Sequence, residues 1–169
     1  MDFVFSIIFI VVGEKEQIKF VVDCMLGKLA KWMRILGFDV VYFKTANDEE
    51  ILKLCLNEGR IILTRDRNLF NIAKKSRAFL VKSDQWEEQA KEVIDNYNLW
   101  DKISPFSRCL NCNYPLKIIE KSSAKNLVPP FPYETFDEFA VCPECGKTYW
   151  PGTHFDVMRL KITKLINDN

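Results

Sequence analysis

Two CxxC pairs constrain the last third of the chain more than any other feature of the sequence. The pairs are Cys109–Cys112 and Cys142–Cys145, with 29 residues between them. Two such pairs can supply the four thiolate corners of a tetrahedral site for structural zinc, which leaves no open position for water. The gap is longer than the usual ~15–20 residues, so we expect an inserted loop over Ile119–Tyr133. A redox dithiol or unrelated cysteines are the alternatives, and two matched pairs favour zinc.

The start of the chain is apolar but lacks the features of an export signal. The run Phe3–Val12 is half the ~20 residues that span a bilayer, and neither preceding lysines nor a cleavage site accompanies it. We expect residues 1–17 to form a hydrophobic leader or an extra strand, with no membrane association. A cytoplasmic location follows, where paired cysteines favour metal over disulfide. The isolated Cys24 and Cys55 are expected to be small buried residues.

From residue 18 to about 100, short apolar runs alternate with segments of helical period. This β-α rhythm predicts an α/β fold with a parallel sheet flanked by helices, and the nearly all-apolar strands indicate helices on both faces. All seven prolines lie at or beyond Pro105, so we place a boundary near residue 100. Residues 101–169 are then a zinc ribbon with a C-terminal tail. The expected strands are Phe20–Val22, Val40–Phe43, Ile61–Leu63 and Phe79–Val81.

Acidic residues follow the predicted strands. Asp23, Asp66 and Asp84 come after the first, third and fourth strands, and Asp48 begins the helix after the second. Ligands of open parallel sheets bind beyond the carboxyl ends of the strands. Carboxylates there can hold Mg²⁺ or Mn²⁺, which activate water and stabilise charge on a phosphodiester. Helix capping explains the same placements, and Asp84 with Glu87 fits a capping box. The metal site requires these carboxylates to converge at one point.

Other features leave alternatives open. The net charge of +1 excludes a strongly basic tail protein, but a local basic patch is compatible with it. His154, the only histidine, is not needed as a zinc ligand and is either a substrate contact or an ordinary surface or core residue. The four tryptophans can stack on bases or pack in the core.

Four stretches resemble, in order, the Mut-seven C-terminal RNase domain family. They are Phe20–Gly37, Asn47–Glu50, Leu63–Arg67 and Tyr149–His154, and the resemblance covers roughly residues 18–160. That family belongs to the PIN nuclease superfamily and carries a C-terminal zinc ribbon. The resemblance implies a PIN-like nuclease domain over residues 18–100, divalent-metal-dependent RNA cleavage, and a ribbon that helps to grip RNA.

The resemblance also assigns roles to individual residues. Asp23, Asp48 and Asp66 fall on PIN-type acidic positions, with Glu50 and Asp84 as further candidates, and Asn47 stands where another acid is expected. Lys28, Arg34 and Arg65 fall on the family's basic positions and are expected to meet RNA phosphates. Arg67 is a further candidate from its place beside Asp66, where Arg65 and Arg67 either neutralise a phosphate or are simply solvated.

The sequence therefore predicts a metal-dependent endoribonuclease that acts on RNA, with single-stranded RNA as the expected form. A non-catalytic RNA-binding module with a vestigial acidic site is the alternative. A receiver-like phosphoacceptor domain is a third interpretation, but it does not explain the fused ribbon.

Overall fold

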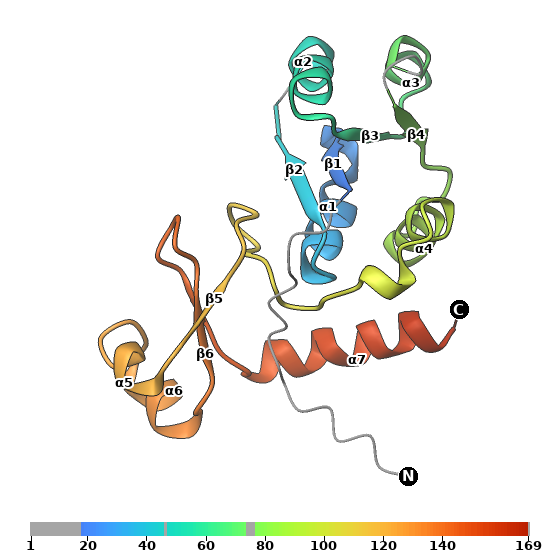
Figure 1. The fold of residues 1–169 in the computed structure, drawn as a ribbon. Coiled ribbons are helices and arrows are strands. Elements are labelled where there is room, and N and C mark those ends of the chain that lie inside the picture. Colours follow the sequence, from blue (N-terminus) through green and yellow to red (C-terminus); the bar gives the residue numbers. More distant parts are fainter. Residues whose placement is uncertain (1–17, 46, 74–76, 169) are drawn as a thin grey trace.

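A four-stranded parallel sheet forms the core of the first part of the chain, in the upper half of Figure 1. The computed structural model describes residues 18–45, 47–73 and 77–168, so the predicted leader lies outside the described residues. The strand order is β2-β1-β3-β4. Chain order and sheet order diverge at β1 and β3, which are neighbours in the sheet although β2 lies between them in the sequence. The strands are β1 (Lys19–Val22), β2 (Asp39–Tyr42), β3 (Ile61–Thr64) and β4 (Ala78–Leu80).

Helices cover both faces of this sheet, as predicted. Phe20 and Val22 of β1 pack on one face with α1 (Gly27–Ile35) and α4 (Trp86–Asn96). Val21 points to the other face, where it meets α2 (Asp48–Glu58) and α3 (Arg67–Ala73). This alternation follows from the two-residue period of a strand. Two of the four tryptophans are core residues: Trp32 stacks on Trp86 with ring centroids 4.0 Å apart and joins α1 to α4.

The caps of α2 and α4 differ in how well the sequence predicted them. Asn47 caps α2 in a reciprocal capping box with Glu50, and Gly59 ends the helix in the left-handed region. The expected capping box of Asp84 with Glu87 is wrong, because α4 begins at Trp86 after Gln85, which makes no side-chain cap. The preceding loop is held instead by the Glu92 carboxylate, which accepts hydrogen bonds from the backbone of Lys82 and Ser83.

The C-terminal part contains a small antiparallel sheet in the order β5-β6-β7. Two short helices, α5 (Lys121–Ala124) and α6 (Pro130–Thr135), occupy the predicted insertion between the cysteine pairs. The strands are β5 (Lys117–Ile119), β6 (Phe139–Val141) and β7 (Thr148–Tyr149).

The segment expected to be a tail is a long helix, α7 (Thr153–Asn167), that returns to the α/β domain (Figure 1). Its Ile162 and Leu165 are buried in the core shared by α1 and α4. Lys91 of α4 donates a hydrogen bond to the carbonyl of Asp168 at the helix end. The ribbon is therefore tied to the first domain at both its beginning and its end. Within the described parts of the chain, no helix is long and apolar enough to cross a bilayer.

Candidate functional site

The four paired cysteines converge, as the sequence predicted. One ligand atom from each of Cys109, Cys112, Cys142 and Cys145 lies within 4.8 Å of all the others. We call each CxxC turn a knuckle. Two Sγ contacts join one knuckle to the other, Cys109 to Cys145 at 3.6 Å and Cys112 to Cys142 at 3.3 Å. Gly146, in the left-handed region, lets the second knuckle turn so that its N–H reaches the carbonyl of Cys142. This set can hold one metal ion such as zinc.

The surroundings of the cysteines favour negative charge on one of them. Burial opposes ionisation of Cys109, but hydrogen bonds from the knuckle backbone and from Tyr149 outweigh it and lower the pKa of this thiol to about 6. The Tyr149 hydroxyl accepts a hydrogen bond from the backbone of Leu110 and lies 3.1 Å from Cys109 Sγ. Burial and the neighbouring thiols raise the pKa of Cys112 to about 12. A bound cation would allow all four thiols to ionise.

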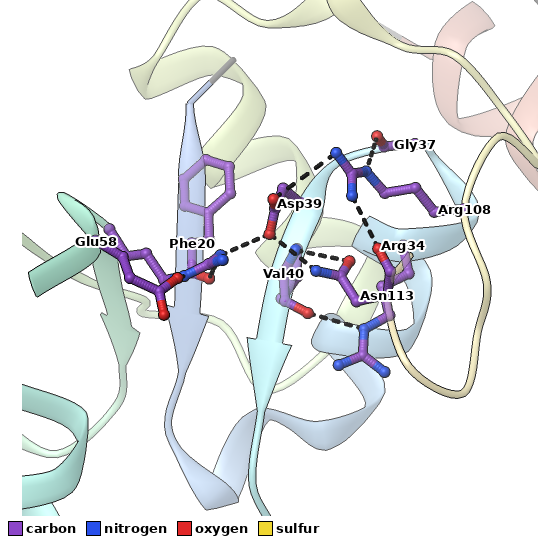
Figure 2. A network of polar contacts seen from close by, with 9 residues as sticks. Phe20, Arg34, Gly37, Asp39, Val40, Glu58, Arg108 and Asn113 are labelled. Carbon is purple, nitrogen blue, oxygen red and sulfur yellow. Dashed lines mark hydrogen bonds and ion pairs between the residues drawn. The ribbon is translucent and has the colours of Figure 1, made fainter. Parts of the chain in front are cut away.

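The first knuckle seals an edge of the parallel sheet (Figure 2). Strand β2 is an edge strand, so the outward backbone groups of Val40 have no neighbouring strand. The Val40 N–H donates to Asn113 Oδ1 at 3.0 Å, and its carbonyl accepts from Arg34 Nε at 2.8 Å. Unpaired buried backbone groups are costly, and these two side chains satisfy them.

Arg34, which was expected to contact RNA, is instead buried, and its guanidinium is bonded within the protein. Only 9% of the residue is exposed. Besides Val40, its guanidinium donates to the carbonyls of Leu110 and Asn111 in the first knuckle, at 3.1 and 3.2 Å. The planar fork of donors suits this task, and it leaves the side chain directed into the protein.

A half-buried carboxylate at the start of β2, that of Asp39, makes further contacts between β2 and the first cysteine pair. Asp39 accepts hydrogen bonds from Arg60 at 2.6 Å and from Asn113 at 2.8 Å, and Arg108 lies 3.8 Å away. Burial by itself would raise the pKa of Asp39, but these donors and the two positive charges outweigh it and lower the pKa below its usual value. The sequence analysis missed Asp39 and Asn113. The only signal was an acid at the beginning of a predicted strand.

At the carboxyl end of the sheet, Asp23 and Asp66 are linked through one hydroxyl group. Thr64 is fully buried, and its hydroxyl donates to Asp23 Oδ2 at 2.7 Å and accepts from the backbone N–H of Asp66 at 2.9 Å. Asp23 follows β1 and Asp66 follows β3, which are neighbouring strands. The point where the strand order reverses is where open α/β sheets bind ligands.

Both aspartates also serve the local fold. Asp23 is 5% exposed and accepts from the backbone N–H of Met25 at 3.1 Å. Asp66 Oδ1 accepts from the backbone of Asn68 at 2.6 Å and of Leu69 at 3.3 Å, at the beginning of α3. Asp23 and Asp66 therefore accept local backbone hydrogen bonds and are also both hydrogen-bonded to the Thr64 hydroxyl.

The other predicted acids do not join this pair. Asp48 and Asp84 are exposed, and the Glu50 carboxylate accepts from the backbone of Asn47. Across residues 18–45, 47–73 and 77–168, the cysteine set is the one group of three or more His, Cys, Asp or Glu ligand atoms close enough to hold a metal. The expected convergence of all four aspartates is thus not seen, and among them only Asp23 and Asp66 are linked, by the Asp23 carboxylate and the Asp66 backbone on Thr64.

The remaining predicted residues lie at the surface. Lys28, Arg65 and Arg67 are exposed, and within the described chain their side chains form no hydrogen bond or ion pair. His154 is exposed in the first turn of α7. Cys55 is buried as expected, whereas Cys24 is exposed, because the 3-10 turn after Asp23 directs it outward.

Comparison with known proteins gives one match. The family model described as the Mut7-C RNAse domain matches residues 18–162, which cover the α/β domain, the ribbon and most of α7. No curated protein and no solved structure matched the chain.

Proposed function

Because the chain belongs to the Mut7-C RNAse domain family, we propose that it is a divalent-metal-dependent endoribonuclease whose active site is built on Asp23 and Asp66. The family match indicates a nuclease-type function with RNA as substrate. The observation that supports this particular site is that Asp23 and Asp66 follow the neighbouring strands β1 and β3 at the switch point, where the Thr64 hydroxyl joins the Asp23 carboxylate to the backbone N–H of Asp66.

The donor set suits Mg²⁺ or Mn²⁺. The four-carboxylate site that the sequence analysis required is not formed, so the proposal is a smaller site on Asp23 and Asp66. It relies on the habit of Mg²⁺ to keep several waters and to bind one or two carboxylates together with substrate phosphates. Asp66 Oδ2 has no hydrogen-bond partner within the described chain and is available as a ligand. When bound, such an ion supplies an activated water and stabilises charge on the phosphate. Thr64 fixes the Asp23 carboxylate, and Asp66 positions the start of α3.

The other predicted residues have supporting roles in this proposal. Asp48, with Asp84 or Glu50, would add negative charge around the site, and the products would carry a 5′-phosphate and a 3′-hydroxyl by resemblance to PIN enzymes. The exposed Lys28, Arg65 and Arg67 are available to contact phosphates. We place the nuclease domain in residues 18–100 and the zinc ribbon, as an aid to RNA binding, in residues 101–169 of a cytoplasmic protein.

The alternative is an RNA-binding module without catalysis. The observation in its favour is that Asp23 and Asp66 each cap a local turn or helix, a role that would preserve both residues in an inactive protein. A nuclease would cleave RNA, whereas a binding module would bind RNA without cleaving it.

The test compares cleavage of single-stranded RNA by the wild type and by Asp23→Asn, in Mn²⁺ and in Mg²⁺. We expect the variant to lose at least about 100-fold in rate, because metal-dependent charge stabilisation is worth several kcal/mol. An asparagine amide can still accept from Met25 or from Thr64, so the variant should fold, which circular dichroism would verify. The control is Asp137→Asn, an exposed carboxylate of the insertion. Equal cleavage by the wild type and Asp23→Asn would refute the assignment.

A further inference from the structure

A groove of about 620 Å³ lies where the ribbon meets α1 and the beginning of α7. It is lined by residues from three parts of the chain: α1 contributes Lys31, the segment before the first knuckle contributes Phe106, and the stretch 147–158 supplies most of the rest. The volume is ample for a nucleotide. None of the four basic residues that the sequence predicted to bind RNA lines this groove.

The groove presents aromatic surface at a partly exposed position. Trp150 is half-buried, and Gly152 packs so closely against its indole that an added Cβ would lie 3.3 Å from the ring nitrogen. Phe155 packs against Phe106 with ring centroids 4.1 Å apart and the rings tilted by 34°, which fixes the wall of the groove. Aromatic faces held in place in this way are suited to stacking on unpaired bases.

The rim of the groove is positively charged. Lys31 and Lys147 are both exposed, and Glu138 is the one acidic residue among those that line the groove. The Lys147 ammonium lies 5.8 Å from the Tyr149 ring centroid, so this side chain extends along the aromatic wall. Arg108 also lines the groove, but it is already engaged with Asp39 and with the carbonyls of Gly37 and Asn113. The charge complements a phosphodiester chain.

Two exposed lysines of α1 lie between this groove and the start of the helix near Asp23. Lys28 and Lys31 are three residues apart on α1, and both are exposed, so they lie on the same side of the helix about 4.5 Å apart along its axis. Lys31 lines the groove, and Lys28 lies in the first turn of α1, which begins four residues after Asp23. A chain of phosphates can follow these two lysines from one site to the other.

We propose that this groove binds an unpaired nucleotide of the RNA substrate, with its base on Trp150 and its phosphates against Lys31 and Lys147. This inference rests on the proposed function and specifies its substrate, because a stacked base of a duplex cannot enter the groove. The groove would select single-stranded RNA and hold it at a distance from the cleaved bond.

The first experiment measures binding of a fluorescein-labelled single-stranded oligouridylate by anisotropy, in the absence of Mg²⁺ and Mn²⁺ and over a range of salt. Lys31→Glu and Lys147→Glu should each weaken binding about fivefold or more at about 0.1 M salt. Each should also make the slope of log K against log salt shallower by about 0.7, the value for one lost phosphate contact on a single strand. The matched control is Lys125→Glu, an exposed lysine of the insertion that is not part of the groove.

The second experiment uses Trp150→Ala, which should weaken binding about tenfold by loss of base stacking and leave the salt slope unchanged. Trp150→Phe keeps an aromatic face and should recover most of the affinity. Zinc content and circular dichroism would verify that the ribbon is intact in each variant. Duplex RNA of the same length should bind more weakly than the single strand and should be insensitive to Trp150→Ala.

The outcomes separate this inference from the proposed function. If all the groove variants bound RNA with wild-type affinity, the proposal that the groove binds RNA would be overturned. Loss of cleavage in Asp23→Asn would then still support the proposed nuclease activity. Conversely, weakened binding in the groove variants without any cleavage by the wild type would support the groove and overturn the nuclease. Failure of the wild type to bind RNA, or equal binding of duplex and single strand, would overturn the groove.

Discussion

Asn113 offers the sharpest test of how the ribbon is joined to the sheet. Replacing it by alanine removes the acceptor of the Val40 N–H and one of the donors to Asp39. A buried N–H without a partner costs about 1–3 kcal/mol, and a hydrogen bond to a charged group contributes about 1.5–3 kcal/mol. Asn113 also has a φ of 66°, where alanine costs about 1–2 kcal/mol. We therefore expect Asn113→Ala to lower the free energy of unfolding by about 4 kcal/mol.

Glycine at this position separates the two causes. Asn113→Gly loses the same hydrogen bonds but accepts the positive φ, so it should be about 1 kcal/mol less destabilising than alanine. The control is Asn111→Ala at an exposed neighbouring position in the same knuckle, which should stay within about 0.5 kcal/mol of the wild type.

Urea unfolding of the zinc-loaded proteins measures these differences. With a slope of about 2 kcal/mol/M, the alanine variant should unfold at a urea concentration about 2 M lower. Hydrogen exchange at Val40 gives a direct reading of the bond itself, and its amide should exchange faster in both variants. A change of less than about 1 kcal/mol in Asn113→Ala, with unchanged exchange at Val40, would refute the idea that this side chain seals the sheet edge.

Three further predictions concern the metal site, the half-buried Asp39 and a close approach of the backbone. Metal analysis should find about one zinc per chain, and Cys142→Ser or a chelator should destabilise the ribbon before the α/β domain, as seen by selective loss of amide protection there. In Asp39→Asn, the free energy of unfolding should depend less on pH in the acid range. The pKa of Asp39 is lowered in the folded protein, so its ionised carboxylate stabilises the fold above the unfolded pKa of about 3.9, and this stabilisation is lost as the pH falls below that value. Gly37→Ala should cost more than about 3 kcal/mol on unfolding, because its Cβ would lie 2.2 Å from the carbonyl oxygen of Ser104 in addition to the strain of its positive φ. Gly59→Ala, with a positive φ but open space, should show only the strain of about 1 kcal/mol.

The local pattern of the chain was sufficient for the first domain. Strand and helix positions follow from periods of 2 and 3.6 residues, which neighbouring residues impose on one another. The ends of α2 were readable for the same reason, since Asn47, Glu50 and Gly59 act within one turn of their own helix. The beginning of α4 was misread because its preceding loop is held by Glu92, whose bonds to Lys82 and Ser83 span 10 and 9 residues.

The two sites differ in how far the sequence could describe them. The cysteine set was predictable because its spacing is itself the geometric requirement of a tetrahedral ion. The aspartates were recognisable as strand-end acids and by resemblance, but their grouping was not. Thr64, which links Asp23 to Asp66, has no distinguishing pattern, and the separation of Asp48 and Asp84 from that pair depends on where α2 and α4 pack.

The sequence by itself determined the order of elements up to about residue 100, the parallel sheet and the grouping of the four paired cysteines. Only the tertiary structure decided that the Arg34 guanidinium is bonded to β2 and to the first cysteine pair, and that Asn113 binds the backbone of Val40, 73 residues away. It also decided that the expected tail is a helix whose Ile162 and Leu165 are buried against α1 and α4. The physical reason is that capping, periodicity and knuckle spacing act within a few residues. The partners of a buried donor or acceptor, in contrast, are fixed by packing between segments that are distant in the chain.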